Sequence, residues 1–222
     1  MFDIALYGHL IVDTIYDGNH KTMELGGLAN MRRTFTKLDN NLNLGIIPTV
    51  LGEADIFINR ETSTRSSKAN LNINKLNFEI KDSSISHVLY INELEHTDFI
   101  QNLPGIITAD CCKGKPINPN LLRYIDYLFV SDDEVSDLET LKELTKGTII
   151  LHSPDGSIIY KDGIEKHYHV DKNIKIQNAN VLGAGDMFAS CFLFAIYNKI
   201  ENAIDYAHTT TSKLLKEMNE KI

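Results

Sequence analysis

A Gly-Ala-Gly turn that opens an apolar helix is the feature that most constrains this chain. Gly183, Ala184 and Gly185 are followed by Asp186 and by a run of mostly apolar residues. Glycines permit a tight turn, and the first amides of a helix attract anions because they lack intrahelical acceptors. A carboxylate there is placed to accept the proton of a hydroxyl that attacks a phosphate. The pattern predicts either a phosphoryl-transfer site or an ordinary loop in which the helix dipole stabilises Asp186.

Length and composition limit the class of protein. The 222 residues fit one sizeable α/β domain, and we treat residues 1–222 as a single domain. A hydrophobic content of 43% indicates a globular chain, and a net charge of −8 argues against a general nucleic-acid binder. No apolar run reaches transmembrane length, so no membrane partner is expected. The three cysteines, at positions 111, 112 and 191, are an odd number, and the adjacent pair is poorly placed to form a disulfide. We therefore expect the reducing environment of the cytoplasm.

The order of apolar segments predicts alternating strands and helices. The expected fold is a three-layer α/β core with a mostly parallel sheet. Segments of about 10–25 and 55–78 are expected to form a small β lid, because polar and apolar positions alternate there in places. Strands are expected at 3–7, 10–16, 42–51, 87–91, 106–110, 126–130, 147–151 and 157–160, and helices at 27–38, 95–102, 118–124, 132–145, 184–198 and 200–220.

A second motif lies near the N-terminus. Gly26 and Gly27 precede a predicted helix that contains Asn30, and Asp13 lies within an apolar strand. A carboxylate and an amide can bind several hydroxyl groups, while the glycines let a ligand approach the backbone. The alternative is a turn before a helix and a carboxylate at the end of a strand.

Both motifs occur in the order typical of one family. The chain resembles the ribokinase-like (PfkB) carbohydrate kinases over nearly its whole length, from Asp13 and the Gly26–Asn30 segment to residues 180–188. The resemblance implies ATP-dependent phosphorylation of a hydroxyl on a sugar or sugar phosphate. It implies that Asp186 is the base and that the amides of Gly183, Ala184 and Gly185 hold the anion. Asp13, Gly26, Gly27 and Asn30 would bind the acceptor.

The resemblance also implies residues for the donor. Glu134 matches the glutamate that helps to organise Mg²⁺ in the family, although Ser131 replaces the family's asparagine. Asp110 ends a strand that would help to line the active cleft. Ser153 and Gly156, together with Gly183 and Gly185, would contact ATP. The 151–156 segment keeps only the last glycine of the family's nucleotide motif. This departure predicts weak ATP binding with loose base selectivity.

Several alternatives remain open from the sequence. Residues 60–70 resemble a segment of the heptose-phosphate kinases, where basic side chains would meet a sugar phosphate; the alternative is a solvated loop. A nucleoside kinase, or a non-catalytic sugar- or nucleotide-binding protein derived from a kinase, would use the same scaffold. The unpaired edges of a small lid predict a homodimer through the lid, against a monomer whose lid closes on its substrate.

Overall fold

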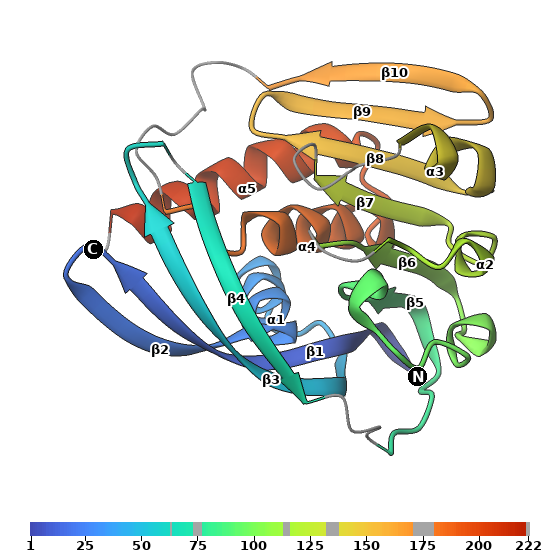
Figure 1. Cartoon of the computed structure of the whole chain (residues 1–222). Coiled ribbons are helices and arrows are strands. Elements are labelled where there is room, and N and C mark those ends of the chain that lie inside the picture. The colour runs from blue at the N-terminus through green and yellow to red at the C-terminus, as the bar shows by residue number, and fades with distance from the viewer. Residues whose placement is uncertain (63, 73–76, 113–115, 132–137, 171–179, 221–222) are drawn as a thin grey trace.

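A computed structural model describes the chain except for residues 63, 73–76, 113–115, 132–137, 171–179 and 221–222 (Figure 1). The described residues form a ten-stranded sheet in the order β10-β9-β8-β7-β6-β5-β1-β3-β4, with β2 paired to β1. The six central strands, β8 to β5 with β1 and β3, run parallel, which confirms the predicted sheet. The strands are β1 (Phe2–Asp17), β2 (His20–Gly27), β3 (Leu44–Asn59), β4 (Thr64–Asn72), β5 (Ser83–Val88), β6 (Ile106–Asp110), β7 (Tyr127–Ser131), β8 (Thr148–Ser153), β9 (Gly156–Lys161) and β10 (Ile164–His169).

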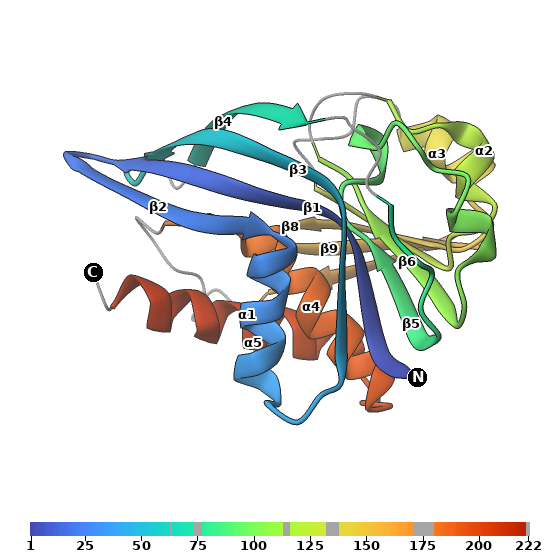
Figure 2. The same cartoon turned by 90° about the horizontal axis from the view of Figure 1, so that it is seen from below.

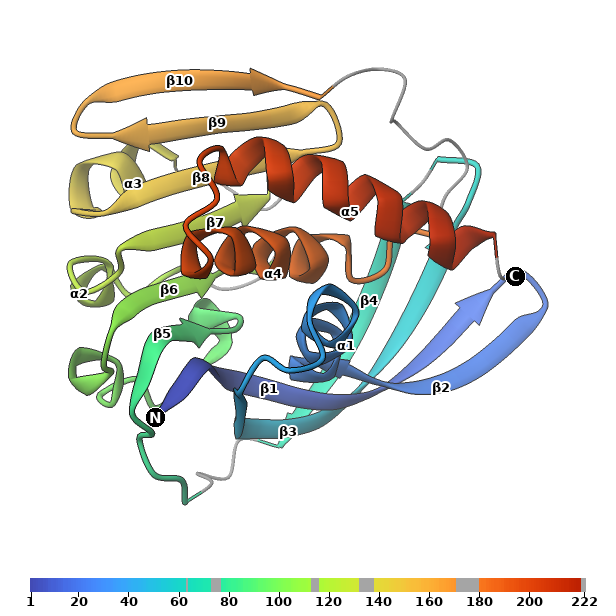
Figure 3. The same cartoon turned by 180° about the vertical axis from the view of Figure 1, so that it is seen from behind.

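Helices cover both faces of the sheet and form the predicted three layers. The helices α1 (Leu28–Leu38), α4 (Ala184–Tyr197) and α5 (Ala203–Asn219) lie on one face (Figure 3). On the other face lie α2 (Pro119–Leu122), α3 (Leu138–Leu144) and the 3₁₀ turns η1 (Ile91–Glu93) and η2 (Ile100–Asn102). Successive residues of β1 face opposite layers, Leu6 packing with α4 and Tyr7 with η2. This two-sided burial explains why residues 4–7 of β1 are all apolar or aromatic.

β1 is a single long strand, so the predicted break at residues 8–9 is wrong. Gly8 keeps the strand continuous with a φ of 135°, and a Cβ there would lie 2.6 Å from the carbonyl oxygen of Leu89. The pairing of β1 with β3 shifts by one residue after Gly8, directly opposite Pro48. A bulge at this point accommodates a proline, which has no amide proton to donate to the neighbouring strand.

The outer halves of β1 and β3 extend beyond the core and form a lid with β2 and β4 (Figure 2). The lid therefore continues the core sheet. The strands cover the predicted segment 10–25 and most of the predicted segment 55–78, since β3 ends at Asn59 and β4 ends at Asn72. Residues 63 and 73–76 lie outside the described part, and residues 77–78 belong to no strand. The inner face of the lid is apolar and consists of Ile11, Ile15, Ala54 and Ile56, packed against Leu71 and Leu182.

Two other elements differ from the predictions. The helix expected at 95–102 is wrong, because η2 provides a single turn before Pro104, where Phe99 packs on Tyr7 at 5.8 Å between ring centroids. β10 was not predicted, although Asp162 and Gly163 both have positive φ and form the turn that precedes it. The first half of the helix expected at 132–145 lies outside the described residues. No helix in the described part is long and apolar enough to cross a membrane.

Candidate functional site

The Gly-Ala-Gly turn lies at the start of α4, as predicted. Gly183 caps the helix in the left-handed region with a φ of 73°, and its carbonyl accepts the amide of Met187 at 2.8 Å. The amide of Ala184, predicted to hold an anion, donates instead to the carbonyl oxygen of Val181 at 3.0 Å. The amides of Gly185 and Asp186 remain in the open first turn of the helix, where amides have no intrahelical acceptor.

Hydrogen bonds hold both carboxylate oxygens of Asp186. The residue is 4% exposed. Asn30 Nδ2 donates to Oδ2 at 2.7 Å, and the hydroxyl of Tyr90 donates to Oδ1 at 3.0 Å. Burial, followed by the charge of Asp110, raises the pKa of Asp186 to about 6, although the two hydrogen bonds and Arg65 oppose the shift. An aspartate with a pKa near neutrality suits a general base.

Asp13 lies on the inner face of the lid. The residue is 3% exposed, and its Oδ1 has no hydrogen-bond partner in the described part of the chain. Burial raises its pKa to about 6. A Cβ on Gly26 would lie 1.8 Å from Oδ2, so this glycine makes room for the carboxylate. A buried oxygen without a partner is costly, and the hydroxyl of a ligand would satisfy it.

A cavity of about 260 Å³ brings the two aspartates together beneath the lid. Its volume is at the small end for ligand sites, which suits a monosaccharide better than a large ligand. The lid contributes apolar walls and one cation, Arg65. Among the residues that line the cavity are His9, Ile11, Asp13, Gly27, Asn30, Ala54, Ile56, Arg65, Ser67, Tyr90, Glu93, Cys112, Gly183 and Asp186.

The Gly-Gly-x-x-Asn motif mainly shapes the backbone and orients neighbouring site residues. Gly27 caps α1 with a φ of 59°, and a Cβ there would lie 2.2 Å from the carbonyl oxygen of His9. Asn30 lines the cavity, but its amide nitrogen bonds the predicted base, and its Oδ1 accepts a hydrogen bond from Arg33. The motif therefore orients Asp186 in addition to facing the predicted acceptor site.

Of the residues predicted to contact the nucleotide, Gly183 lines this cavity, whereas Ser153 and Gly156 do not. Ser153 and Gly156 form the turn between β8 and β9, where Ser153 Oγ donates to the carbonyl oxygen of Gly156 at 3.3 Å. A Cβ on Gly156 would lie 1.9 Å from the carbonyl oxygen of Tyr168, so its glycine is required by strand pairing. The nearest part of β8 to the helix start is His152, 3.7 Å from a Cβ built on Gly185.

The prediction for magnesium concerns Glu134, which lies outside the described residues. Within the described part of the chain, no group of three or more His, Cys, Asp or Glu side chains is placed to hold a metal ion. The expected role of Glu134 therefore stays a prediction.

A second cavity of about 840 Å³ lies on the other side of the Gly-Ala-Gly turn, between the β1–β2 hairpin, α1 and α5. Asn30, Leu182 and Gly183 line both cavities. The helix start therefore lies between the smaller cavity and the larger one.

Tyr90 is the site residue that the sequence did not reveal. It was expected inside a strand at 87–91, but β5 ends at Val88, and Tyr90 follows it. Ligand sites in parallel sheets lie beyond the carboxyl ends of the strands, so a more accurate strand end would have identified this residue.

Comparisons with known proteins agree with this fold. No protein-family profile matches the chain, and no curated protein matches its sequence. Solved structures match nearly all of it. They include a ribokinase from Thermotoga maritima, 18% identical with a TM-score of 0.70 over 95% of this chain and 91% of that chain. A ribokinase from Arabidopsis thaliana complexed with ribose and ATP is 14% identical, with a TM-score of 0.68 over 97% and 93%. A pyrophosphate-dependent kinase in the ribokinase family is 16% identical, with a TM-score of 0.66 over 96% and 95%. The chain has the ribokinase fold, which confirms the fold predicted from the resemblance.

The raised pKa of Asp186 predicts a pH-dependent stability. Its pKa is about 6 in the folded chain against an ordinary value of 3.8, so the folded state retains a proton that the unfolded state has lost. Stability should therefore fall as the pH rises from about 4 to 6, by on the order of 3 kcal/mol for a shift of about two units.

Asp186→Asn removes this penalty. At each pH, the effect of the substitution is the free energy of unfolding of the variant minus that of the wild type. This difference should be more positive at pH 8 than at pH 4 by about 2–3 kcal/mol, so the substitution is relatively stabilising at the higher pH. Urea denaturation at the two pH values measures the difference, and Asp98→Asn, an exposed carboxylate, is the matched control. An equal effect of Asp186→Asn at both pH values would contradict the raised pKa.

Proposed function

We propose that this chain phosphorylates a hydroxyl group of a sugar or sugar phosphate, with ATP as the phosphoryl donor and Mg²⁺ as the cofactor. The observation that carries the proposal is the buried Asp186, held at both oxygens in the first turn of α4 and facing a monosaccharide-sized cavity. The fold shared with kinases that act on small hydroxyl compounds supports it.

The acceptor would bind between the lid and the helix start. Asp13 would accept hydrogen bonds from its hydroxyls through the unpartnered Oδ1, and the apolar lid residues would cover a face of the ring. Asp186 would accept the proton of the attacking hydroxyl, which increases the negative charge on that oxygen as the bond to phosphorus forms. The amides of Gly185 and Asp186 would stabilise the charge of the transferred phosphoryl group.

The donor would approach the same helix start from outside the acceptor cavity. Mg²⁺ takes most of its ligands from water and phosphate oxygens, so few protein ligands are needed. When bound, it would neutralise phosphate charge. The turn formed by Ser153 and Gly156 has no glycine-rich loop for a nucleotide, which supports weak ATP binding and makes the smaller donor pyrophosphate a second compound to test.

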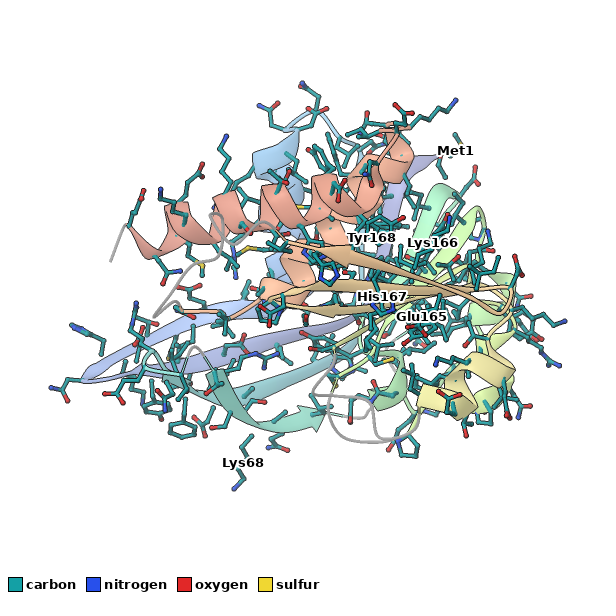
Figure 4. The ribbon with its side chains drawn as sticks, turned by 90° about the horizontal axis from the view of Figure 1, so that it is seen from above. Met1, Lys68, Glu165, Lys166, His167 and Tyr168 are labelled. Carbon is teal, nitrogen blue, oxygen red and sulfur yellow. The ribbon has the colours of Figure 1, made fainter. Side chains whose placement is uncertain are left out.

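Arg65 would bind an anionic group on the acceptor. β4 alternates, so Arg65 and Ser67 face the cavity, whereas Lys68 projects away from the molecule (Figure 4). Arg60, the other basic residue predicted to meet a phosphate, forms an ion pair with Asp17 at 2.6 Å. Of these basic residues, only Arg65 lines the cavity, and a guanidinium pairs well with phosphate oxygens.

The first test of the function is Asp186→Asn in a phosphoryl-transfer assay. A thermal-shift panel of sugars, sugar phosphates and nucleosides, each with Mg-ATP and with pyrophosphate, selects the substrate pair. We expect kcat to fall by about 10²–10⁴-fold, because the base is lost, while acceptor affinity changes little. Asp98→Asn is the control and should retain full activity. A substantially unimpaired Asp186→Asn enzyme would refute the assignment.

The second test compares two basic residues of one strand. Arg65→Ala should raise KM for a phosphorylated acceptor about 10-fold or more, with a smaller effect on the corresponding neutral sugar, because it removes a charged hydrogen bond. Lys68→Ala should leave both KM values unchanged. Steady-state kinetics with the two acceptors give the comparison, and equal effects of Arg65→Ala on both would contradict a phosphate-binding role.

A non-catalytic binding protein is the rival that one observation favours. Neither Ser153 nor Gly156 lines either of the two cavities described above, which favours a chain that does not bind a nucleotide in the predicted way. Under this rival, sugars would shift the thermal stability, but no donor would yield a phosphorylated product.

The lid would also form a homodimer. Met23, Leu25 and Phe57 are 68%, 49% and 49% exposed and lie on its outer face, where Phe57 stacks on Tyr16 at 4.8 Å between ring centroids. Among the described strands, none pairs with the outer edge of β4. A second copy of the lid would cover this apolar face and pair this edge.

Light scattering tests the dimer. We expect about twice the 25.0 kDa of one chain at micromolar concentration. Phe57→Glu should reduce the mass to one chain, because it places a charge in the apolar face. Ile164→Glu, at an exposed position on the opposite sheet edge, should leave it unchanged. A 25.0 kDa wild-type particle, with and without ligands, would rule the dimer out.

A further inference from the structure

Tyr90 connects two buried carboxylates. Its backbone amide donates to Asp110 Oδ1 at 2.5 Å, and its hydroxyl donates to Asp186 Oδ1 at 3.0 Å. Asp110 is 6% exposed, and its Oδ2 lies 3.7 Å from Nε2 of the buried His87. Tyr90 therefore links the end of β6 to the first turn of α4.

The backbone of Tyr90 is held in an unfavourable conformation. Its φ of 56° and ψ of 54° lie in the left-handed region, which residues with a side chain rarely adopt. Such a conformation persists where surrounding contacts fix it, and it is concentrated at functional sites. Here the carboxylate of Asp110 accepts the amide, and the ring packs edge-on against His9 at 5.5 Å between centroids.

We propose that Tyr90 is a positioning residue that keeps Asp186 ionised and fixes its orientation toward the acceptor hydroxyl. The inference rests on the proposed function of the same site. Asn30 holds Oδ2 and Tyr90 holds Oδ1, so the carboxylate cannot rotate freely. Asn30 and Tyr90 both donate hydrogen bonds to the carboxylate, and such donors favour its charged form.

The surroundings show why a donor is needed at this point. Burial and the charge of Asp110 both favour protonated Asp186, while Asn30, Arg65 and Tyr90 favour the ionised form. When the hydroxyl of Tyr90 is removed, fewer groups counteract the effect of burial on Asp186, and the pKa of Asp186 should rise. Among the described residues, the titratable groups around Asp186 are Asp110 at the end of β6, Arg65 on β4, Tyr90 after β5, His9 and Asp13 on β1, Glu93 in η1, Cys112 after β6 and His152 in β8.

The test is the pH profile of Tyr90→Phe. Loss of one hydrogen bond to a charged group should move the acidic limb of kcat/KM upward by about one pH unit. The activity of the variant relative to wild type should then fall about fivefold from pH 8 to pH 6. Tyr197→Phe is the matched control, because the hydroxyl of Tyr197 donates to Asp3 at 2.5 Å away from the cavity. Its profile should coincide with that of the wild type.

A direct titration separates this inference from the proposed function. Carbon NMR of ¹³C-labelled aspartate, assigned with Asp186→Asn, should give a midpoint near pH 6 in the wild type and a midpoint about one unit higher in Tyr90→Phe. A wild-type chain that transfers no phosphate from any donor would refute the proposed function, and the NMR shift would still test the contact. An unchanged midpoint in folded Tyr90→Phe would overturn the inference. If that variant does not fold, 3,5-difluorotyrosine at position 90, a stronger donor of the same shape, should lower the midpoint, and no change would again overturn it.

Discussion

The burial of one carboxylate determines most of the arrangement around the site. Asp186 is almost inaccessible to water and lies close to a second buried acid, Asp110, so its ionised form depends on donors that are fixed in place. Those donors come from α1 and from the turn after β5, which are far apart in the sequence. The packing of α1 and α4 in one core cluster brings Asn30 to the carboxylate, and the end of β5 brings Tyr90. The core therefore supports the site by setting these distances.

The position of Asp13 in the cavity beneath the lid depends on the length of two strands. β1 and β3 leave the core and continue as the lid, so Asp13 reaches the cavity on the same strand that carries the core residues Leu6 and Tyr7. The bulge after Gly8 lets the two strands remain paired past Pro48. A lid built in this way is joined to the core by continuous backbone hydrogen bonds, which limits how far it can move as a separate body.

The local motifs were predictable from the sequence, and the contacts between distant segments were not. Gly27 and Gly183 have positive φ, and Gly26 leaves room for the carboxylate of Asp13, so glycine is required at these positions and leaves a pattern in the sequence. The bond from Tyr90 to Asp186 depends on where β5 ends, and the position of Arg65 depends on the register of β4 against β3. Residues 153–156 were assigned to a nucleotide from alignment to a motif, yet their geometry satisfies a tight hairpin.

The lid and the turn before α4 are also fixed by a shared set of contacts at the end of α5. Asn219 accepts the amide of Asn180 at 2.7 Å and donates to its carbonyl oxygen at 3.2 Å. Arg60 of the lid donates to the same Asn219 at 3.4 Å and forms a two-pronged bond with Asp17. Because Asn180 in turn accepts the amide of Leu182, a displacement of the lid tip would strain the backbone that leads into Gly183. The lid and the start of α4, which the proposed function assigns to acceptor and phosphate binding, are therefore held by the same contacts.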